Sequence, residues 1–242
     1  MEIGIIGFGR FGKLLTKYLS EDNKVYVFSR SGKDEEIKKS KGIPASLQEV
    51  CKKDIIIPCV PISKFEAVLN KIKKLLKNSS LVIDVCSVKE YPIKVMKKIL
   101  PEKIGILATH PMFGPDSASE TVKGRKIGLC KVRVSNEKYR KIKECLEKKG
   151  LIIIETTPER HDKEIAKSLL LTHFIGRGLL GLGAKNLDID TEGYKRLMNI
   201  LDMVKNDTKQ LFEDMNRYNK YSKDIRKGFI KSLNKIDKRL EK

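Results

Sequence analysis

The sequence predicts a doubly wound α/β domain with a mostly parallel sheet, followed by an all-α C-terminal domain. Two patterns carry this prediction. Short apolar runs alternate with amphipathic segments up to about residue 156, which is typical of strands joined by crossover helices. Beyond that point apolar residues recur only at helical spacing. We therefore expect two domains, at residues 1–156 and 157–242.

Each strand of the first domain is predicted from a short apolar run. The run at 54–61 is almost continuously apolar, which indicates a strand buried on both faces of a parallel sheet. Predicted strands lie at 2–6, 24–30, 54–61, 81–88, 103–110, 126–135 and 151–157. Apolar residues spaced three or four apart predict helices at 10–20, 63–77, 92–100 and 136–150.

The C-terminal domain is predicted to contain only helices. Pro158 and Glu159 are residue types that favour the first turn of a helix. The stretch 194–240 has the periodicity of two or three helices. Because such helices bury their apolar stripe against another element, and few strands remain to cover them, we expect a homodimer through these C-terminal helices.

The chain is strongly basic, with 51 Lys and Arg against 31 Asp and Glu and a formal net charge of +20. The cations are mixed with acidic residues along most of the sequence, aromatic residues make up only 6%, and Trp is absent. Nucleic-acid-binding proteins more often concentrate cations in one arm or stripe with interleaved aromatics. We therefore expect a Lys-rich surface that attracts small anions, and we do not expect nucleic acid as the main partner.

No segment indicates a membrane span or a metal site. No unbroken apolar run approaches the roughly 18 residues that a spanning helix needs, and the apolar stretch at 3–11 lacks the basic lead-in of a signal peptide. The sequence therefore predicts a cytoplasmic protein. The five cysteines form no C-x-x-C pair and have no His at metal-ligand spacing. Cys59 and Cys86 lie in apolar segments and are expected to be buried free thiols.

Two phosphate-binding signatures overlap after the first strand. Gly7 to Lys13 match most of a P-loop, but a P-loop requires Ser or Thr after its lysine, and Leu14 stands there. The G-x-G-x-x-G pattern instead has its full context, since it follows a strand and opens a helix. The sequence therefore predicts a Rossmann-type NAD(P)-binding domain. The expected cofactor contacts are Gly7, Phe8, Gly9, Arg10, Phe11 and Gly12, with Val60 and Pro61 at the end of the third predicted strand.

The end of the second predicted strand selects between the two cofactors. NAD-preferring sites usually place Asp or Glu there to accept a hydrogen bond from the ribose 2′-OH. This chain has Ser29, Arg30 and Ser31 instead, which offer a cation and two hydroxyls to a 2′-phosphate. We expect NADP to be preferred over NAD. The alternative is that Arg30 merely points into solvent.

Three polar residues follow strands of the predicted parallel sheet. His110 ends one strand, and Ser87 and Lys89 come from the end of the strand before it. Since ligands of such sheets bind at the carboxyl ends of the strands, we expect all three to face the same crevice. An imidazole, a hydroxyl and an ammonium beside a nicotinamide would polarise a substrate alcohol as hydride leaves. A structural role for a single histidine is the alternative.

Five segments in order resemble the prephenate/arogenate dehydrogenase family of tyrosine biosynthesis. They are "GIIGFGRFG", "DVCSVKEYP", "THPMFGPD", "ERHDKEIA" and "LLLTHF", and "HPMFGPDS" is the most specific. The resemblance extends from residue 2 to about 215. It implies a nicotinamide-binding N-terminal domain, a helical C-terminal dimerisation domain, and oxidative decarboxylation of prephenate to 4-hydroxyphenylpyruvate or of arogenate to tyrosine.

The resemblance also implies roles for single residues. His110 matches the catalytic histidine that hydrogen-bonds the ring hydroxyl, Ser87 a serine that helps hold it, and Lys89 a lysine of the same motif. His173 and Arg196 match substrate-binding positions, Arg196 as the cation for a substrate carboxylate. Lys195 is an adjacent alternative to Arg196, and a buried structural His173 is a second alternative. His161, with Asp162, is expected to cap a helix start.

Two other functions remain open at this stage. One is another two-domain NADP-dependent dehydrogenase or reductase of the β-hydroxyacid type, although "HPMFGPD" is not expected there. The other is a non-catalytic dinucleotide-binding or nucleic-acid-binding protein that exploits the basic charge. The sequence does not separate prephenate from arogenate as the substrate.

Overall fold

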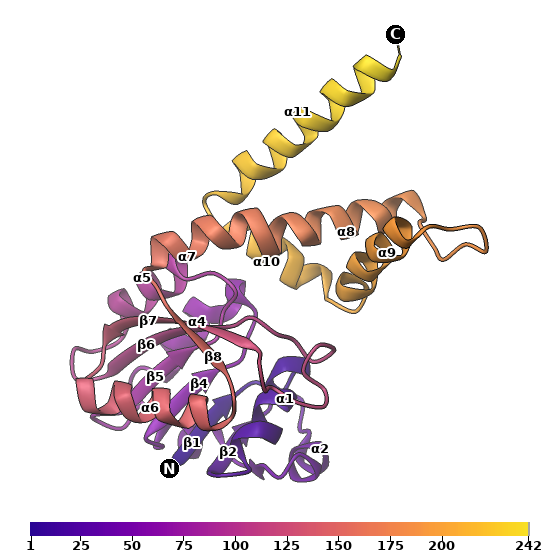
Figure 1. The fold of residues 1–242 in the computed structure, drawn as a ribbon. Helices are drawn as coiled ribbons and strands as arrows, with labels where there is room; N and C mark the ends of the chain where they lie inside the picture. Colours follow the sequence, from indigo (N-terminus) through magenta and orange to yellow (C-terminus); the bar gives the residue numbers. More distant parts are fainter. Residues whose placement is uncertain (242) are drawn as a thin grey trace. The chain divides into compact units, whose positions relative to one another are not determined.

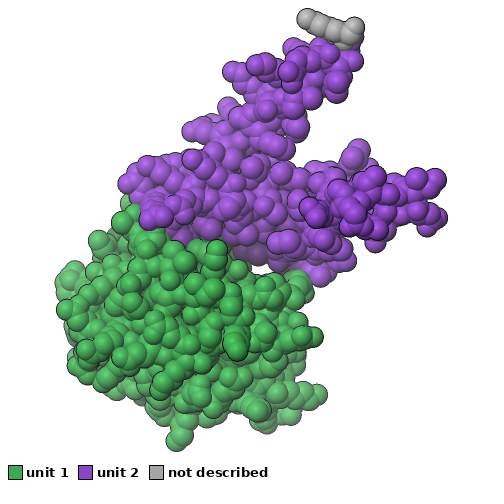
Figure 2. All heavy atoms as spheres, in the orientation of Figure 1, with its two compact units in different colours: residues 1–158 green, residues 159–242 purple. Residues whose placement is uncertain are grey.

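The computed structural model describes residues 1–241 of the chain. These form two compact units, Met1–Pro158 and Glu159–Lys242, coloured separately in Figure 2. The division lies two residues from the boundary that the sequence predicts. The first unit contains the sheet and the second contains only helices, as the ribbon in Figure 1 shows.

The first unit is built on one eight-stranded sheet with the strand order β3-β2-β1-β4-β5-β6-β7-β8. Pairing is parallel from β3 through to β6, antiparallel between β6 and β7, and parallel again between β7 and β8. This confirms the predicted doubly wound, mostly parallel sheet. The strands are β1 (Glu2–Ile6), β2 (Lys24–Phe28), β3 (Ile43–Pro44), β4 (Ile55–Pro58), β5 (Leu81–Asp84), β6 (Gly105–Pro111), β7 (Lys126–Arg133) and β8 (Ile152–Glu155).

Six helices connect these strands. They are α1 (Arg10–Leu19), α2 (Asp34–Lys39), α3 (Leu47–Cys51), α4 (Ile62–Ile72), α5 (Glu90–Ile99) and α6 (Asn136–Lys148). The sequence analysis leaves the region of α2, β3 and α3 unassigned because these elements are only two to six residues long. One local signal does exist there: Ser46 and Glu49 form a reciprocal capping box at the start of α3.

The central strands β1, β4, β5 and β6 are buried on both faces because strands alternate side chains between the two sides of a sheet, whereas the outer strand β8 is mostly exposed. Ile3 and Ile5 of β1 pack in a core cluster with Leu14 of α1 and Tyr139 of α6. Between them, Gly4 points to the other face, where an added Cβ would lie 2.5 Å from the carbonyl oxygen of Val50 in α3. Glycine therefore permits the close approach of α3 to β1.

The described part of the second unit, up to residue 241, contains five α-helices, the first beginning at Pro158, and one π-helical turn. They are α7 (Pro158–Ile165), the π-turn η1 (Ala166–Leu170), α8 (Leu171–Leu182), α9 (Glu192–Lys205), α10 (Lys209–Tyr218) and α11 (Ser222–Leu240). The prediction of two or three helices within 194–240 is confirmed, with three. In Figure 1, α11 (yellow) projects away from the other helices of this unit.

One helical segment corrects an expectation about hydrophobic length. The continuous helix Pro158–Leu182 has 25 residues and is apolar enough to cross a membrane by length and composition alone. The sequence analysis counted unbroken apolar runs and therefore missed it. The same helix carries Arg177 and the buried His173, and ionisable groups at membrane depth are costly. We therefore interpret its apolar surface, which includes the exposed Leu180 and Leu182, as a surface for protein packing.

Candidate active site

One backbone hydrogen bond and two close backbone contacts define the glycine turn after β1. Gly7 has a φ of +105°, and its amide donates to the carbonyl of Phe28 at 2.9 Å. An added Cβ at Gly7 would lie 2.4 Å from the carbonyl oxygen of Cys59, and one at Gly12 would lie 2.3 Å from that of Gly7. At Gly9 a Cβ would meet nothing within 4 Å. The turn is therefore packed against β4 on one side and open at Gly9.

Gly9 is also the N-cap of α1, with no side chain capping the helix and no acidic residue in its first turn. The first amides of α1 thus offer hydrogen bonds and a positive helix end to an anion. Phe8, in contrast, is buried in the apolar core, so only its backbone lies at the turn. Val60 is half-buried and Pro61 exposed at the end of β4.

The end of β2 presents the three predicted 2′-phosphate contacts. Arg30 is exposed, and the hydroxyl oxygens of Ser29 and Ser31 lie 3.2 Å apart on either side of it in sequence. No acidic residue occupies positions 29–31. The two hydroxyls therefore converge next to a cation.

Ser87 and His110 lie at the ends of neighbouring strands. His110 is the penultimate residue of β6, and Ser87 follows the end of β5, which pairs in parallel with β6. Both lie at the carboxyl ends of the parallel strands, the same end of the sheet that carries the glycine turn. The Ser87 hydroxyl oxygen is buried and has no hydrogen-bond partner within residues 1–241. Only 4% of His110 is exposed, so the imidazole is far less open to the crevice than the sequence analysis expects.

Lys89 differs most from its expected placement. Its side chain is 0% exposed and forms an ion pair with Asp84, whose side chain is also 0% exposed. The ammonium donates to Asp84 Oδ1 and to the main-chain oxygen of Thr109. The expectation that Lys89 presents its ammonium to the crevice is therefore wrong. The ammonium instead bonds to buried oxygens at the ends of β5 and β6.

The loop between β6 and β7, residues 112–125, is anchored on α1. Arg10 pairs with Asp116 at 2.6 Å, the Tyr18 hydroxyl donates to the Ala118 carbonyl at 2.8 Å, and Lys17 donates to the Ser119 carbonyl at 3.1 Å. The segment that follows His110 is therefore tied to the helix that follows the glycine turn.

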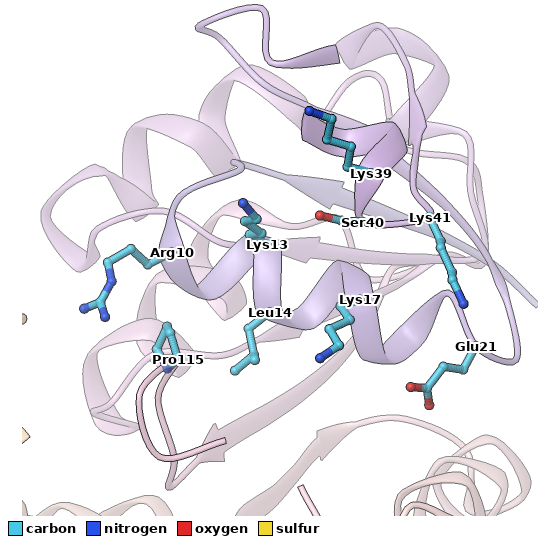
Figure 3. Close-up of a pocket in the computed structure, with 9 residues that line it drawn as sticks. All are labelled: Arg10, Lys13, Leu14, Lys17, Glu21, Lys39, Ser40, Lys41 and Pro115. Atoms are coloured by element: carbon cyan, nitrogen blue, oxygen red, sulfur yellow. The ribbon is translucent and has the colours of Figure 1, made fainter. Parts of the chain in front are cut away.

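A cavity of about 420 Å³ lies along the outer flank of α1 (Figure 3). Five cations and one acid are among the residues that line it: Arg10, Lys13, Lys17, Lys39, Lys41 and Glu21. Three of these cations already bond to Asp116, Glu36 and the Ser119 carbonyl. We therefore place the candidate site at the strand ends rather than in this open groove.

In the second unit, His173 belongs to a small polar cluster on α8. Its Nε2 lies 3.7 Å from the Asp207 carboxylate, and Arg177, one turn later, donates to the Asp207 carbonyl. Burial lowers the pKa of His173, and Asp207 counteracts that shift only in part. Nδ1 of His173 and Nε of Arg177 are buried without hydrogen-bond partners in the described residues.

Arg196 and His161, the other two predicted residues of this unit, lie outside the cluster around His173. Arg196 is exposed on α9 and is not part of the cluster around His173. His161 is buried, and its Nδ1 lies 2.8 Å from Asp162 Oδ1. This pairing lies in the packed interior of the helical unit and does not indicate the predicted capping role. The roles of His173 and Arg196 toward substrate stay predictions.

The cysteines are free thiols, and four of the five are shielded. Burial raises the pKa of Cys51 to about 11 and that of Cys59 to about 12, so neither is a reactive thiolate at neutral pH. Cys145 is exposed. Within residues 1–241, no group of three or more His, Cys, Asp or Glu could hold a metal ion.

Comparison with known proteins decides the family. The family model described as "Prephenate dehydrogenase, nucleotide-binding domain" matches residues 16–155, more than half of the chain. The chain belongs to the prephenate dehydrogenase family. A second family model, "TYRAAT1-like, C-terminal domain", matches residues 179–242. The first unit is therefore a nucleotide-binding domain of this family, as the sequence resemblance implies.

Individual family members agree with this assignment. Arogenate dehydrogenase 2, chloroplastic, of Arabidopsis thaliana is 32% identical over 232 residues, which cover 90% of this chain and 64% of that protein. Arogenate dehydrogenase 1, chloroplastic, of the same plant is 33% identical over 229 residues, covering 90% of this chain and 36% of that protein. The chain thus spans about two thirds or less of the length of these relatives.

A solved structure of a prephenate dehydrogenase has the same fold. It is the enzyme from A. aeolicus in complex with hydroxyphenyl propionate and NAD⁺, with a TM-score of 0.77 and 20% identity. The similarity covers 99% of this chain and 90% of that one. The combination of a doubly wound sheet with a helical second unit is therefore the architecture of a prephenate dehydrogenase.

Sequence reasoning missed the partner of Lys89. Asp84 is the last residue of β5 and binds both Lys89 and the Cys86 amide. A carboxylate at the end of a buried strand, five residues before a lysine, was the available signal. Arg177 was also missed, although it lies four residues after His173 and hence on the same helix face.

Proposed function

We propose that this chain catalyses the NADP-dependent oxidative decarboxylation of prephenate to 4-hydroxyphenylpyruvate, or of arogenate to tyrosine, a step of tyrosine biosynthesis. The observation that carries the proposal is the position of His110 within "HPMFGPD". It stands at the end of β6, beside the strand whose end leads to Ser87, on the sheet edge that carries the glycine turn. Membership of the prephenate dehydrogenase family supports the same reaction.

The glycine turn fits the pyrophosphate of a dinucleotide. The open space at Gly9 and the uncapped N-terminus of α1 are what a phosphate group requires for close approach and hydrogen bonding. β1 and β6 are separated by β4 and β5, so the turn and His110 lie three strand spacings apart, or about 14 Å along the edge. An extended dinucleotide bound at the turn would bring its nicotinamide toward β5 and β6.

The 2′-phosphate of NADP would be held at the end of β2. Arg30 supplies a charge-assisted hydrogen bond, and the hydroxyls of Ser29 and Ser31 supply two neutral ones. Because these positions hold no carboxylate, the ribose 2′-OH of NAD would lack its usual acceptor. This chemistry favours NADP over NAD.

The proposed proton chemistry rests on His110 and Ser87. NADP, when bound, supplies the acceptor for the hydride that leaves the substrate ring. His110 accepts the proton of the ring hydroxyl, so positive charge does not build on that oxygen. The Ser87 hydroxyl, which lacks a hydrogen-bond partner within residues 1–241, orients the same ring hydroxyl. Loss of CO₂ is then driven by aromatisation of the ring and needs no further side chain.

The burial of His110 limits the access of water to its imidazole during the proposed reaction. With only 4% of the residue exposed, water is largely kept from the imidazole. Exclusion of water strengthens the hydrogen bond between the imidazole and the ring hydroxyl.

The deciding experiment is a steady-state assay at 340 nm with prephenate and arogenate, each with NADP⁺ and NAD⁺. We expect absorbance to rise with one of the two substrates and kcat/KM to be higher with NADP⁺. In Arg30→Asp the ratio of kcat/KM for NADP⁺ over NAD⁺ should fall about 10- to 100-fold, because a hydrogen bond to a charged group contributes about 1.5–3 kcal/mol. Absence of turnover with both substrates contradicts the proposed reaction, and an unchanged ratio contradicts the role of Arg30.

We also propose that the chain forms a homodimer through its C-terminal helices. On α11, Phe229, Leu233, Ile236 and Leu240 follow the alternating four- and three-residue spacing of a helix–helix seam. Leu233 is 48% exposed and Leu240 is 81% exposed. An apolar stripe of this length, together with the exposed apolar residues of α8, favours burial against a second copy.

Sedimentation equilibrium tests the dimer. The wild-type chain should have twice the mass of the 27.6 kDa monomer, and Leu233→Lys with Ile236→Lys should give the monomer mass. Lys231→Ala with Lys238→Ala changes the opposite side of α11 and should leave the dimer intact. A monomeric wild-type chain at micromolar concentration would rule out the proposed interface.

A further inference from the structure

The strongest unexplained feature is the buried ion pair between Asp84 and Lys89. Both side chains are 0% exposed. The Lys89 ammonium, bound to Asp84 Oδ1, also donates to the main-chain oxygen of Thr109. The Thr109 hydroxyl in turn donates to the main-chain oxygen of Asp84 at 2.7 Å. In addition to the backbone hydrogen bonds of the sheet, two side-chain interactions therefore join the ends of β5 and β6. The Lys89 ammonium bridges the Asp84 carboxylate and the Thr109 carbonyl, and the Thr109 hydroxyl donates to the Asp84 carbonyl.

These links act on the backbone next to both candidate catalytic residues. The Thr109 carbonyl belongs to the same planar peptide as the His110 nitrogen, so an ammonium on its oxygen fixes the plane from which His110 projects. On the other strand, Asp84 Oδ1 accepts from the Cys86 amide at 2.9 Å, which fixes the bend that leads to Ser87. One carboxylate therefore determines the direction of both segments.

Stability of the fold does not explain the pair. Replacing a buried ion pair by apolar residues of similar size is often neutral or stabilising. Asp84 Oδ2 is buried without a hydrogen-bond partner within residues 1–241, so its carboxylate is incompletely compensated. Burial raises the pKa of Asp84, and the Lys89 ammonium counteracts that rise. A costly arrangement beside Ser87 and His110 points to a role in their geometry.

We infer that Asp84 and Lys89 form one positioning unit, which holds the His110 imidazole and the Ser87 hydroxyl in their reactive orientation through Thr109 and Cys86. Neither residue touches the substrate. The catalytic consequence rests on the proposed dehydrogenase function, whereas the orientation of the imidazole is measurable without it.

The test is the double variant Asp84→Asn with Lys89→Met. The first change keeps an acceptor for the Cys86 amide, and the second keeps the aliphatic length of lysine, while the two charges and the ammonium's link to Thr109 are lost. We expect Tm and the Kd for NADPH to stay near the wild-type values. kcat should fall about 10²-fold with little change in KM, since a displacement of about 1 Å of a reacting group has that effect.

A second readout does not depend on turnover. The chain has three histidines, so their imidazole C2–H resonances can be resolved by NMR and His110 assigned with the His110→Asn variant. In the double variant the His110 resonance should move, while those of His161 and His173, which lie in the second unit, should not. A purely structural pair would leave the His110 resonance in place.

Arg133 provides a matched control at the opposite end of β6. Its guanidinium donates to the carbonyls of Ile104, Leu100 and Pro101, at 2.9, 3.2 and 3.0 Å. Arg133→Met therefore removes a comparable cation from backbone carbonyls far along the strand from His110. We expect a lower Tm, but an unchanged His110 resonance and, below the transition, an unchanged kcat.

The outcomes are separable. A folded double variant with wild-type kcat and an unmoved His110 resonance overturns the positioning inference. If the wild-type chain turns over neither substrate, the proposed function fails, and the resonance still decides the inference. If the double variant does not fold, Asp84→Asn alone removes the carboxylate charge that pairs with Lys89 but keeps an acceptor for the Cys86 amide, and a wild-type resonance and kcat in that variant overturn the inference equally.

Discussion

Replacing His110 by alanine should lower kcat by about 10²–10⁴-fold, the usual contribution of a positioned acid–base group. The imidazole is the one proton acceptor that the proposed reaction needs, and it stands at the end of β6 beside the Ser87 hydroxyl. Once it is removed, positive charge must build on the ring oxygen as the hydride leaves. KM should change far less than kcat, because this interaction strengthens in the transition state.

The burial of His110 makes a stability control necessary. At 4% exposure, truncation to alanine leaves a cavity and removes polar contacts, so Tm should fall. The Kd for NADPH measures whether the first unit is intact at the assay temperature, since the glycine turn lies about 14 Å away along the sheet edge. Near-wild-type turnover in a folded His110→Ala variant would remove His110 from the mechanism.

The fold was predictable to the extent that apolar patterning determines it. The seven predicted strands are present because each one is a short apolar run, and all consecutive pairs but β6 and β7 are joined through helices. β3, with two residues, and α2 and α3, with six and five, are too short to show a period, and tertiary packing stabilises them. The membrane-length helix was missed because polar residues such as Lys167, His173 and Arg177 interrupt its apolar runs, although its mean hydropathy over 18 residues reaches 1.2.

The candidate site was predictable by position but not by side-chain direction. Strand ends of a parallel sheet meet at one edge, so Ser87 and His110 could be placed together from spacing alone. The direction of Lys89 could not be read in the same way. It depends on a carboxylate from the preceding strand and a carbonyl from the following one, and these contacts exist only in the folded chain. The exposure of Arg196 likewise depends on how α9 packs in the second unit.

Gly9 and Gly12 should give opposite results when each is changed to alanine, although both belong to the G-x-G-x-x-G pattern. At Gly12 the new Cβ would lie 2.3 Å from the Gly7 carbonyl oxygen, so the backbone must shift, and such overpacking costs about 1–3 kcal/mol of unfolding free energy. At Gly9 the new Cβ meets nothing within 4 Å, and the φ of −78° is ordinary for alanine. Thermal unfolding should therefore show a lower Tm for Gly12→Ala only.

Gly9→Ala should weaken cofactor binding even though it should leave Tm unchanged. If the pyrophosphate rests on the N-terminus of α1, a methyl group at Gly9 occupies the path of a phosphate oxygen and breaks at least one charge-assisted hydrogen bond. The Kd for NADPH, measured by fluorescence titration, should rise about 10- to 100-fold, equivalent to the roughly 1.5–3 kcal/mol of such a bond. Gly181→Ala on α8, where a Cβ also meets nothing within 4 Å, is the matched control and should change neither Kd nor fold. A wild-type Kd in Gly9→Ala would mean that the open space at this turn is not where the phosphates bind.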